Sequence, residues 1–389
     1  MPISIKDQCA IAGIGATEFS KNSGRSELQL ALECVKSAIE DAGLTVADID
    51  GMVTYSIDGS DEIAIMRGLG SEKLRFFSRV PHGIGGAVAL VHQAVMAIAS
   101  GSANAVACYR ALNGHSAIQP DPTAVGGPLS TDQIHWSWYT PYGLVSGPSW
   151  AALFTRRYMD AYGAGEDSLA EIAVAMRRHA ASNPHAIFYE QPLSRADYDA
   201  SPWAAEPLRV ADCCLDVDGG CAFIVTSTER ARDLPHPPAV IRAVAHGAAA
   251  DQELMTSFYR SELAEMPEYD VVARECYRQS GLGPGDIDVA LLYDAFSSIV
   301  WFQLESFGFC GRGEAHEFVK NGALSAGGRL PTNTHGGQLG EGHLQGVNSI
   351  IESVRLVRGQ SANQPDKCDH ILVSSGFGVP TSAMIVGRI

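Results

Sequence analysis

Apolar and polar positions follow two periods along the chain, and the same succession of periods occurs twice. Residues 35–44 place apolar side chains three and four positions apart and end in Gly-Leu, which is typical of an amphipathic helix with a glycine at its C-terminal cap. After Asp-Ile-Asp at 48–50, an apolar stretch runs to Tyr55. This stretch predicts a short buried strand.

A second copy of this pattern follows at a constant offset of 238 positions (281 minus 43) and needs no gap. It covers 273–282, repeats Asp-Ile-Asp at 286–288 and ends in Tyr293. Self-similarity over a whole helix, turn and strand indicates an internal duplication.

A further pair of matching segments supports the duplication. Helices are predicted at 87–100 and 344–358, each after a glycine-rich turn, and each leads to an apolar strand, at 105–109 and 371–374. Alternating helices and apolar strands predict an α/β fold with mostly parallel sheets that are covered on both faces.

The duplication divides the chain into an N-terminal half, 1–240, and a C-terminal half, 241–389. Within the first half, residues 112–210 form a long insert rich in Trp, Tyr, Pro and His, with helices expected at 151–162 and 168–181. Long inserts in compact folds commonly carry binding functions. We therefore expect this insert to supply substrate specificity or a subunit interface.

Composition narrows the possible functions. With 389 residues, 46% of them hydrophobic, the chain can build a large core. A formal net charge of −16 argues against a nucleic-acid-binding surface. The N-terminus has no basic segment followed by an apolar run, and no apolar run is long enough to span a bilayer, so we expect a cytoplasmic protein without membrane contact.

The nine cysteines include no C-x-x-C pair, and several lie inside apolar stretches. Even the group Cys213, Cys214 and Cys221 fits no common zinc spacing and has no histidine close behind it. We interpret the cysteines as reduced core residues and expect no metal site.

Three segments of the second half resemble sequence elements of the thiolase superfamily. Residues 336–346, Gly-Gly-Gln-Leu-Gly-Glu-Gly-His-Leu-Gln-Gly, resemble its Gly-His-Pro-x-Gly element, and Tyr-Asp-Ala-Phe at 293–296 resembles Asn-Glu-Ala-Phe. Residues 374–378 resemble the Cys-x-Gly-Gly-Gly-x-Gly loop. With the duplication, the resemblance covers essentially the whole chain. It implies the thiolase fold, in which two βαβαβαββ halves form a five-layer α-β-α-β-α core.

Further segments resemble the lipid-transfer-protein branch of that superfamily: 109–113, 141–144, 156–159, 179–184 and 206–214. This branch includes the retro-aldolases of steroid side-chain degradation, which work with a small partner that combines a zinc ribbon with an OB fold. The resemblance therefore implies a homodimer that binds such a partner in a heterotetramer. It also implies an acyl-CoA substrate and no separate cofactor.

The nucleophile of a thiolase is missing. A thiolase needs a thiolate at the N-terminus of the buried helix in its first half, but residues 80–90 contain no cysteine, and the equivalent position falls at or near His82. In the C-terminal loop, residues 372–374 are Leu-Val-Ser where thiolases have a second cysteine. Acyl-enzyme chemistry is therefore not expected.

A retro-aldol reaction needs no covalent intermediate, because it requires one base, one acid and a site for the enolate oxygen. Tyr293, at the end of a predicted strand, and His343, between a glycine turn and a helix, are the candidates for proton transfer. We expect burial and the helix dipole to lower the pKa of His343 and keep its imidazole neutral. The resemblance implies tyrosine at both positions, so this chain departs from the pattern at His343. Which of the two is base and which is acid stays open.

Three other residues are candidates for the substrate or oxyanion site. His82 and His335 share glycine-rich surroundings and are expected either to face the same cavity or to serve in caps and turns. Gly376 is a candidate backbone donor for the oxyanion, with a tight turn of positive φ as the alternative.

Two other functions remain open from the sequence. A thiolase-like acyltransferase with an unexpected nucleophile would become acylated, most simply on a cysteine. A non-catalytic subunit that binds lipid or acyl-CoA and holds a partner would not depend on Tyr293 or His343. The retro-aldol cleavage of a bulky β-hydroxyacyl-CoA, such as a 17-hydroxy steroid side-chain thioester, to a ketone and propanoyl-CoA is the function that the resemblance favours.

Overall fold

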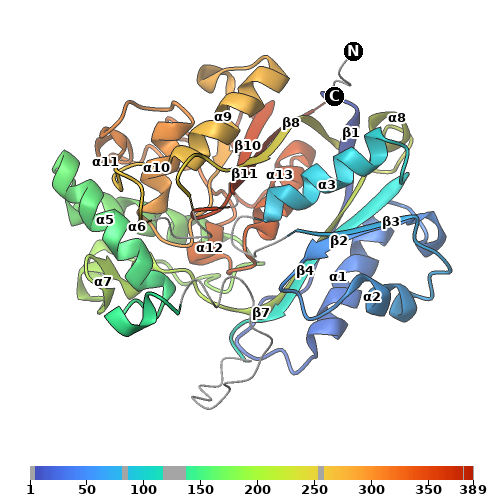
Figure 1. Cartoon of the computed structure of the whole chain (residues 1–389), viewed down its shortest axis with the longest axis horizontal. Helices are drawn as coiled ribbons and strands as arrows, with labels where there is room; N and C mark the ends of the chain where they lie inside the picture. Colours follow the sequence, from blue (N-terminus) through green and yellow to red (C-terminus); the bar gives the residue numbers. More distant parts are fainter. Residues whose placement is uncertain (1–4, 81–85, 117–136, 253–257, 380, 389) are drawn as a thin grey trace.

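The computed structural model describes residues 5–80, 86–116, 137–252, 258–379 and 381–388 (Figure 1). The first half contains β1 (Cys9–Ala16), α1 (Glu27–Asp41), β2 (Gly51–Tyr55), α2 (Glu62–Leu69), β3 (Phe76–Val80), α3 (Ala87–Ala99), β4 (Ala105–Asn113), β7 (Asp218–Ser227) and α8 (Thr228–Ala231). The second half contains β8 (Ala239–Gly247), α9 (Pro267–Ser280), β9 (Val289–Leu291), α10 (Ile299–Ser306), α11 (Ala315–Phe318), α12 (Gly337–Gly340), α13 (Val347–Arg358), β10 (His370–Ser375) and β11 (Thr381–Gly387). Between β4 and β7 lie α5 (Gly147–Tyr162), α6 (Glu166–Ser182), α7 (Arg195–Ala200), β5 (Trp203–Ala205) and β6 (Leu208–Arg209). Within these ranges, no helix is both long and apolar enough to cross a membrane.

Strand pairing confirms the duplication. The large sheet has the order β3-β2-β4-β7-β1-β8-β11-β10-β9. In the first half β2 pairs with β4 in parallel, and β4, β7 and β1 continue antiparallel. In the second half β9 and β10 are parallel, and β10, β11 and β8 continue antiparallel.

The second half departs from the expected pattern at one strand. Where β3 pairs with β2 in the first half, the described part of the second half has only an isolated parallel bridge between Ala290 and Thr332. The two halves also join into a single sheet, because β1 and β8 pair at Ala10–Val240 and Ile11–Ala239.

Helices cover the sheet in layers. On the outer faces, α1 packs against β1, β4 and β7, and α9 packs against β8 and β11. Between the halves, α3 and α13 contact strands of both. The apolar residues of α3 surround the helix, which fits a helix covered on all sides. This arrangement is the five-layer order that the family resemblance implies. The prediction of mostly parallel sheets is wrong, because five of the eight pairings between described strands of the large sheet are antiparallel.

The insert lies at one side of the molecule, where α5, α6 and α7 gather away from β3 (Figure 1). Both long helices are confirmed, and each begins a few residues earlier than predicted. Ser146 and Pro148 start α5, while Glu166 and Asp167 occupy the first turn of α6, where acidic side chains are favourable. Because α6 packs against α12, the insert contacts the glycine-rich loop of the second half.

Candidate active site

Tyr293 follows β9 in the interior of the protein and is fully buried. Its backbone is fixed by one side chain from α10: the Tyr293 N–H donates to Gln303 Oε1 at 3.0 Å, and Gln303 Nε2 donates to the Tyr293 carbonyl at 2.6 Å. The amide of Gln303 thus replaces the strand partner that Tyr293 lacks and holds its side chain in one direction.

His343 follows α12 on a loop whose shape requires glycine. Gly342 has φ +152°, and a Cβ there would lie 3.0 Å from Phe19 and 3.1 Å from Val217. The backbone N–H of His343 donates to the Leu215 carbonyl at 3.0 Å. The imidazole is thereby carried toward Tyr293, with 15% of the side chain exposed.

The structure brings the two predicted residues together. His343 Nε2 lies 3.1 Å from the hydroxyl of Tyr293, and His343 Nδ1 lies 3.0 Å from Asp216 Oδ1. The three side chains form a continuous row of carboxylate, imidazole and phenol. Such a row can move a proton along hydrogen bonds.

This row borders a pocket of about 250 Å³. Trp150, Phe296 and Phe377 form an aromatic wall, and Trp150 comes from the first turns of α5, so the insert contributes to the pocket. Cys214 and Asp216 lie on the polar side together with the pair. Apolar walls with a few convergent polar groups are typical of a site for an organic ligand.

The expectation of a lowered pKa for His343 is wrong. Burial does lower it, but electrostatic interaction with Cys214, together with hydrogen bonds to Asp216 and Cys214, outweighs burial and raises the pKa of His343 to about 10. Burial also raises the pKa of Tyr293 well above its usual value. The sequence could not show this, because Cys214 and Asp216 come from a segment more than a hundred positions away.

Comparison with known proteins shows the family of the chain. A family model described as thiolase C-terminal domain-like matches residues 248–387. The steroid side-chain-cleaving aldolase of Thermomonospora curvata is 53% identical over 97% of this chain and 97% of its own length. The chain belongs to the thiolase superfamily, in its aldolase branch.

Two more relatives place this aldolase in the same branch. The 17-hydroxy-3-oxo-4-pregnene-20-carboxyl-CoA lyase of Mycobacterium tuberculosis is 47% identical over 98% of this chain and 100% of its own length. A solved structure described as an Ltp2-ChsH2(DUF35) aldolase matches with a TM-score of 0.95 and 52% identity, over 99% of both chains.

In the aldolase, the segment Cys213–Asp216 forms part of the site, although the sequence did not predict this. From the sequence, Cys213 and Cys214 are expected to be core residues, and no pattern distinguishes Asp216. Both cysteines are only partly buried and border the pocket. The resemblance of residues 206–214 to the lipid-transfer-protein branch pointed to this part of the chain, but not to Asp216. Among the residues that the structure describes, no group of ligands suits a metal ion.

The aldolase places the lesser candidates differently. His335 is fully buried, does not border this pocket, and lies with Nε2 3.3 Å from Ser349 Oγ. Burial, Arg355 and His179 lower the pKa of His335 to about 3, so it stays neutral. Gly376 has φ +133° and accepts a hydrogen bond from Tyr269 at its carbonyl, directly before Phe377 of the pocket. His82 lies outside the described residues.

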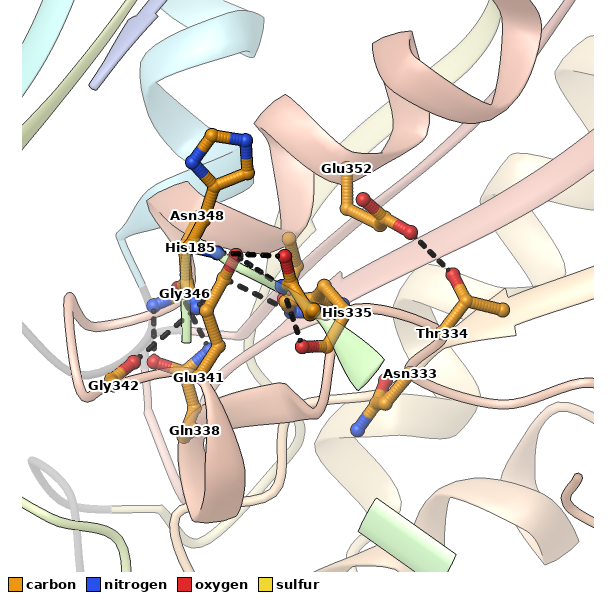
Figure 2. Close-up of polar contacts among 12 residues, drawn as sticks. His185, Asn333, Thr334, His335, Gln338, Glu341, Gly342, Gly346, Asn348 and Glu352 are labelled. Atoms are coloured by element: carbon orange, nitrogen blue, oxygen red, sulfur yellow. Dashed lines mark hydrogen bonds and ion pairs between the residues drawn. The ribbon is translucent and has the colours of Figure 1, made fainter. Parts of the chain in front are cut away.

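A buried polar network fixes the loop that carries His343 (Figure 2). Glu341 accepts hydrogen bonds from Asn183 at 3.1 Å and from Asn348 at 2.9 Å, and Asn348 also donates to the Gly342 carbonyl at 3.2 Å. His335 belongs to this network through its carbonyl, which accepts a hydrogen bond from Asn183 Nδ2 at 2.9 Å. Its role in the aldolase is therefore to hold the loop behind the site.

Proposed function

We propose that this aldolase cleaves the Cα–Cβ bond of a bulky β-hydroxyacyl-CoA, of the 17-hydroxy steroid side-chain type, to a ketone and propanoyl-CoA. The contact between Tyr293 and His343 in an aromatic pocket is the observation that carries the proposal. The printed names of two relatives, a steroid side-chain-cleaving aldolase and a pregnene carboxyl-CoA lyase, support the substrate class.

One proton passes through the pair in each turnover. Tyr293 takes the proton of the β-hydroxyl while its own proton moves to Nε2 of a neutral His343. The Cα–Cβ bond then breaks, its electrons enter the thioester carbonyl as an enolate, and the β-carbon leaves as a ketone. The pair returns the proton to Cα, so the enzyme ends as it began. These proton transfers use side chains of the protein and require no cofactor.

The proton affinity of the pair suits an alcohol substrate. An ordinary imidazole, with a pKa of about 6.5, is a weak base toward an aliphatic hydroxyl. Because Asp216 and Cys214 outweigh burial and raise the pKa of His343 to about 10, the neutral imidazole is a stronger base here. The cost is that only a small fraction of the enzyme is in the reactive form at neutral pH.

For the enolate oxygen we propose backbone N–H groups of the loop around Gly376. This loop follows β10, and its next residue, Phe377, borders the pocket. The hydrogen bond from Tyr269 to the Gly376 carbonyl fixes the peptide plane, and a fixed plane suits preorganised donors.

We also propose a homodimer that binds a small partner with a zinc ribbon and an OB fold in a heterotetramer. Support for the partner comes from the solved relative, whose description names ChsH2(DUF35) alongside Ltp2. A pocket of about 250 Å³ is too small for a whole steroid CoA thioester, so much of the substrate must lie along neighbouring surfaces.

The test is to co-express the chain with such a partner and supply a 17-hydroxy steroid side-chain CoA thioester. Mass spectrometry should detect propanoyl-CoA and the 17-ketosteroid in equal amounts, and both should disappear in the Tyr293→Phe variant. Bound thioester without products would contradict the proposal. Acylation of Cys214, the thiol beside the pair, would instead support an acyltransferase.

A further inference from the structure

The segment Cys213–Asp216 lies between the two elements that carry the pair. On one side the Cys214 N–H donates to the carbonyl of Ala295, two residues after Tyr293, at 2.8 Å. On the other side the Leu215 carbonyl accepts from the His343 N–H at 3.0 Å. The segment is thus held by backbone hydrogen bonds to both elements, and its side chains have a defined place relative to both.

From this position Asp216 contacts the edge of the His343 imidazole that faces away from Tyr293. Its Oδ1 lies 3.0 Å from His343 Nδ1, while Nε2 on the opposite edge of the ring lies 3.1 Å from the Tyr293 hydroxyl. A ring with one nitrogen fixed by a carboxylate can neither flip nor carry its proton on the other nitrogen alone. The contact therefore determines which nitrogen meets Tyr293.

We propose that Asp216 is the positioning residue of His343, accepting the Nδ1–H bond so that the Nε2 lone pair of the neutral ring points at Tyr293. The inference rests on the proposed proton transfer and adds to it the group that sets its geometry. It also explains how a histidine can serve here, since only an imidazole offers a second nitrogen for such support.

Asp216 acts beside two other titratable groups that face the ring, Cys214 from the same segment and Tyr293 from the loop after β9. Burial lowers the pKa of His343, but Cys214 and Asp216 together raise it to about 10. Removing the Asp216 charge while keeping Cys214 and Tyr293 should therefore lower that pKa.

The variant Asp216→Asn tests the role through its kinetics. We expect kcat to fall about 100-fold and KM to change less than about threefold, because Asp216 acts through His343. The alkaline rise of kcat/KM should also move to lower pH. The matched control is Asp199→Asn on α7: Asp199 is 51% exposed and Asp216 47%, and each accepts a hydrogen bond from one cationic or titratable side chain. This control should leave the kinetics unchanged.

A second background separates positioning from a general structural effect. In His343→Tyr, the phenol has no second nitrogen for Asp216, so adding Asp216→Asn should change kcat less than about threefold. Equal losses in both backgrounds, or a loss confined to KM, would overturn the inference.

A measurement without turnover keeps the inference separate from the proposed function. In protein labelled with ¹³C and ¹⁵N at histidine, the signal absent from His343→Gln identifies His343. Its neutral form should carry the proton on Nδ1 in the wild type, and its titration should move to lower pH in Asp216→Asn. An unchanged titration would contradict the role of Asp216 even if the steroid thioester is cleaved. Failure of cleavage with a shifted titration would contradict only the proposed reaction.

Discussion

Two tyrosines occupy equivalent positions in the duplicated halves but have different surroundings. Tyr55 ends β2, and Tyr293 follows β9 at the offset of the repeat; both are fully buried. The hydroxyl of Tyr55 donates a long hydrogen bond of 3.4 Å to the Gln345 carbonyl. The hydroxyl of Tyr293 meets an imidazole at 3.1 Å. Only Tyr293 contacts a side chain that can take up a proton and release it again. The two copies of the repeat therefore differ in chemistry.

This difference gives a matched pair of variants. Tyr293→Phe removes the group that takes the substrate proton, so we expect kcat to fall by about 100- to 10,000-fold. Tyr55→Phe removes a weak contact at the equivalent position and should keep kcat within about threefold. Steady-state assays measure both, and circular dichroism confirms that each variant folds. Similar activities for the two variants would show that Tyr293 has no chemical role.

The raised pKa of His343 predicts how activity depends on pH. Although burial acts in the opposite direction, Cys214 and Asp216 bring the pKa of His343 to about 10, so the base form grows with each step in pH from 7 toward 10. We expect kcat/KM to rise roughly tenfold per pH unit in this window and to level off above it. Profiles of the wild type and of His343→Gln test this, because the rise should be absent from the variant. A profile that falls above pH 7 would instead make the imidazolium the acid.

At the scale of elements, α12 depends on a glycine that no other residue can replace. Gly337 has φ +66°, and a Cβ there would lie 1.9 Å from Asp294 Oδ2. The same carboxylate accepts a hydrogen bond from the Gln338 N–H at 2.7 Å, which ties the start of α12 to the residue after Tyr293. The two loops that carry the pair are therefore joined at their bases.

Gly337→Ala should destabilise the protein by about 2–4 kcal/mol, because it adds backbone strain and a clash with a buried carboxylate. The control is Gly359→Ala after α13, where φ is +71° but nothing lies within 4 Å of the new Cβ. That variant should cost only about 1 kcal/mol. Urea denaturation measures both free energies of unfolding. Equal losses would mean that contact with Asp294 adds nothing.

How well the sequence predicts a structural feature depends on how far apart its contacting residues lie along the chain. The repeat, the helices of the insert and the residues Tyr293 and His343 follow from local periodicity and from short motifs. Asp216 does not, since it meets His343 across 127 positions and its neighbours show no periodic pattern. The prediction for the pKa of His343 was wrong for the same reason. Burial and the helix end can be inferred from the neighbouring sequence, but Cys214 and Asp216, which outweigh burial, lie far away in the sequence.

At the scale of the whole molecule, β3 is an edge strand of the sheet among the residues that the structure describes. Its residue Phe77 is 58% exposed, which is unusual for a large apolar side chain on an edge strand unless another chain covers it. This edge is a candidate for the dimer contact that the family resemblance implies. The boundaries of the halves, near residue 240, stay a prediction.

A charge at this edge should weaken the dimer. We expect the wild type to have a mass of twice 41.3 kDa by light scattering and Phe77→Arg to shift toward 41.3 kDa at micromolar concentration. Leu28→Arg, at a 36% exposed position of α1, is the control and should leave the mass unchanged. A dimer that tolerates Phe77→Arg would have its interface elsewhere.

The place of β11 in the sheet affects how the enzyme matures during synthesis. β11 follows every other strand in sequence, yet it lies between β8 and β10. Among the described strands, β11 alone pairs β10 and β9 with the rest of the sheet, so before β11 is synthesised the loop of Tyr293 lacks this connection. Asp216 and its segment are synthesised earlier than Tyr293 and His343, the residues beside which they lie in the folded protein. We therefore expect a molecule truncated before β11 to be inactive rather than partly active.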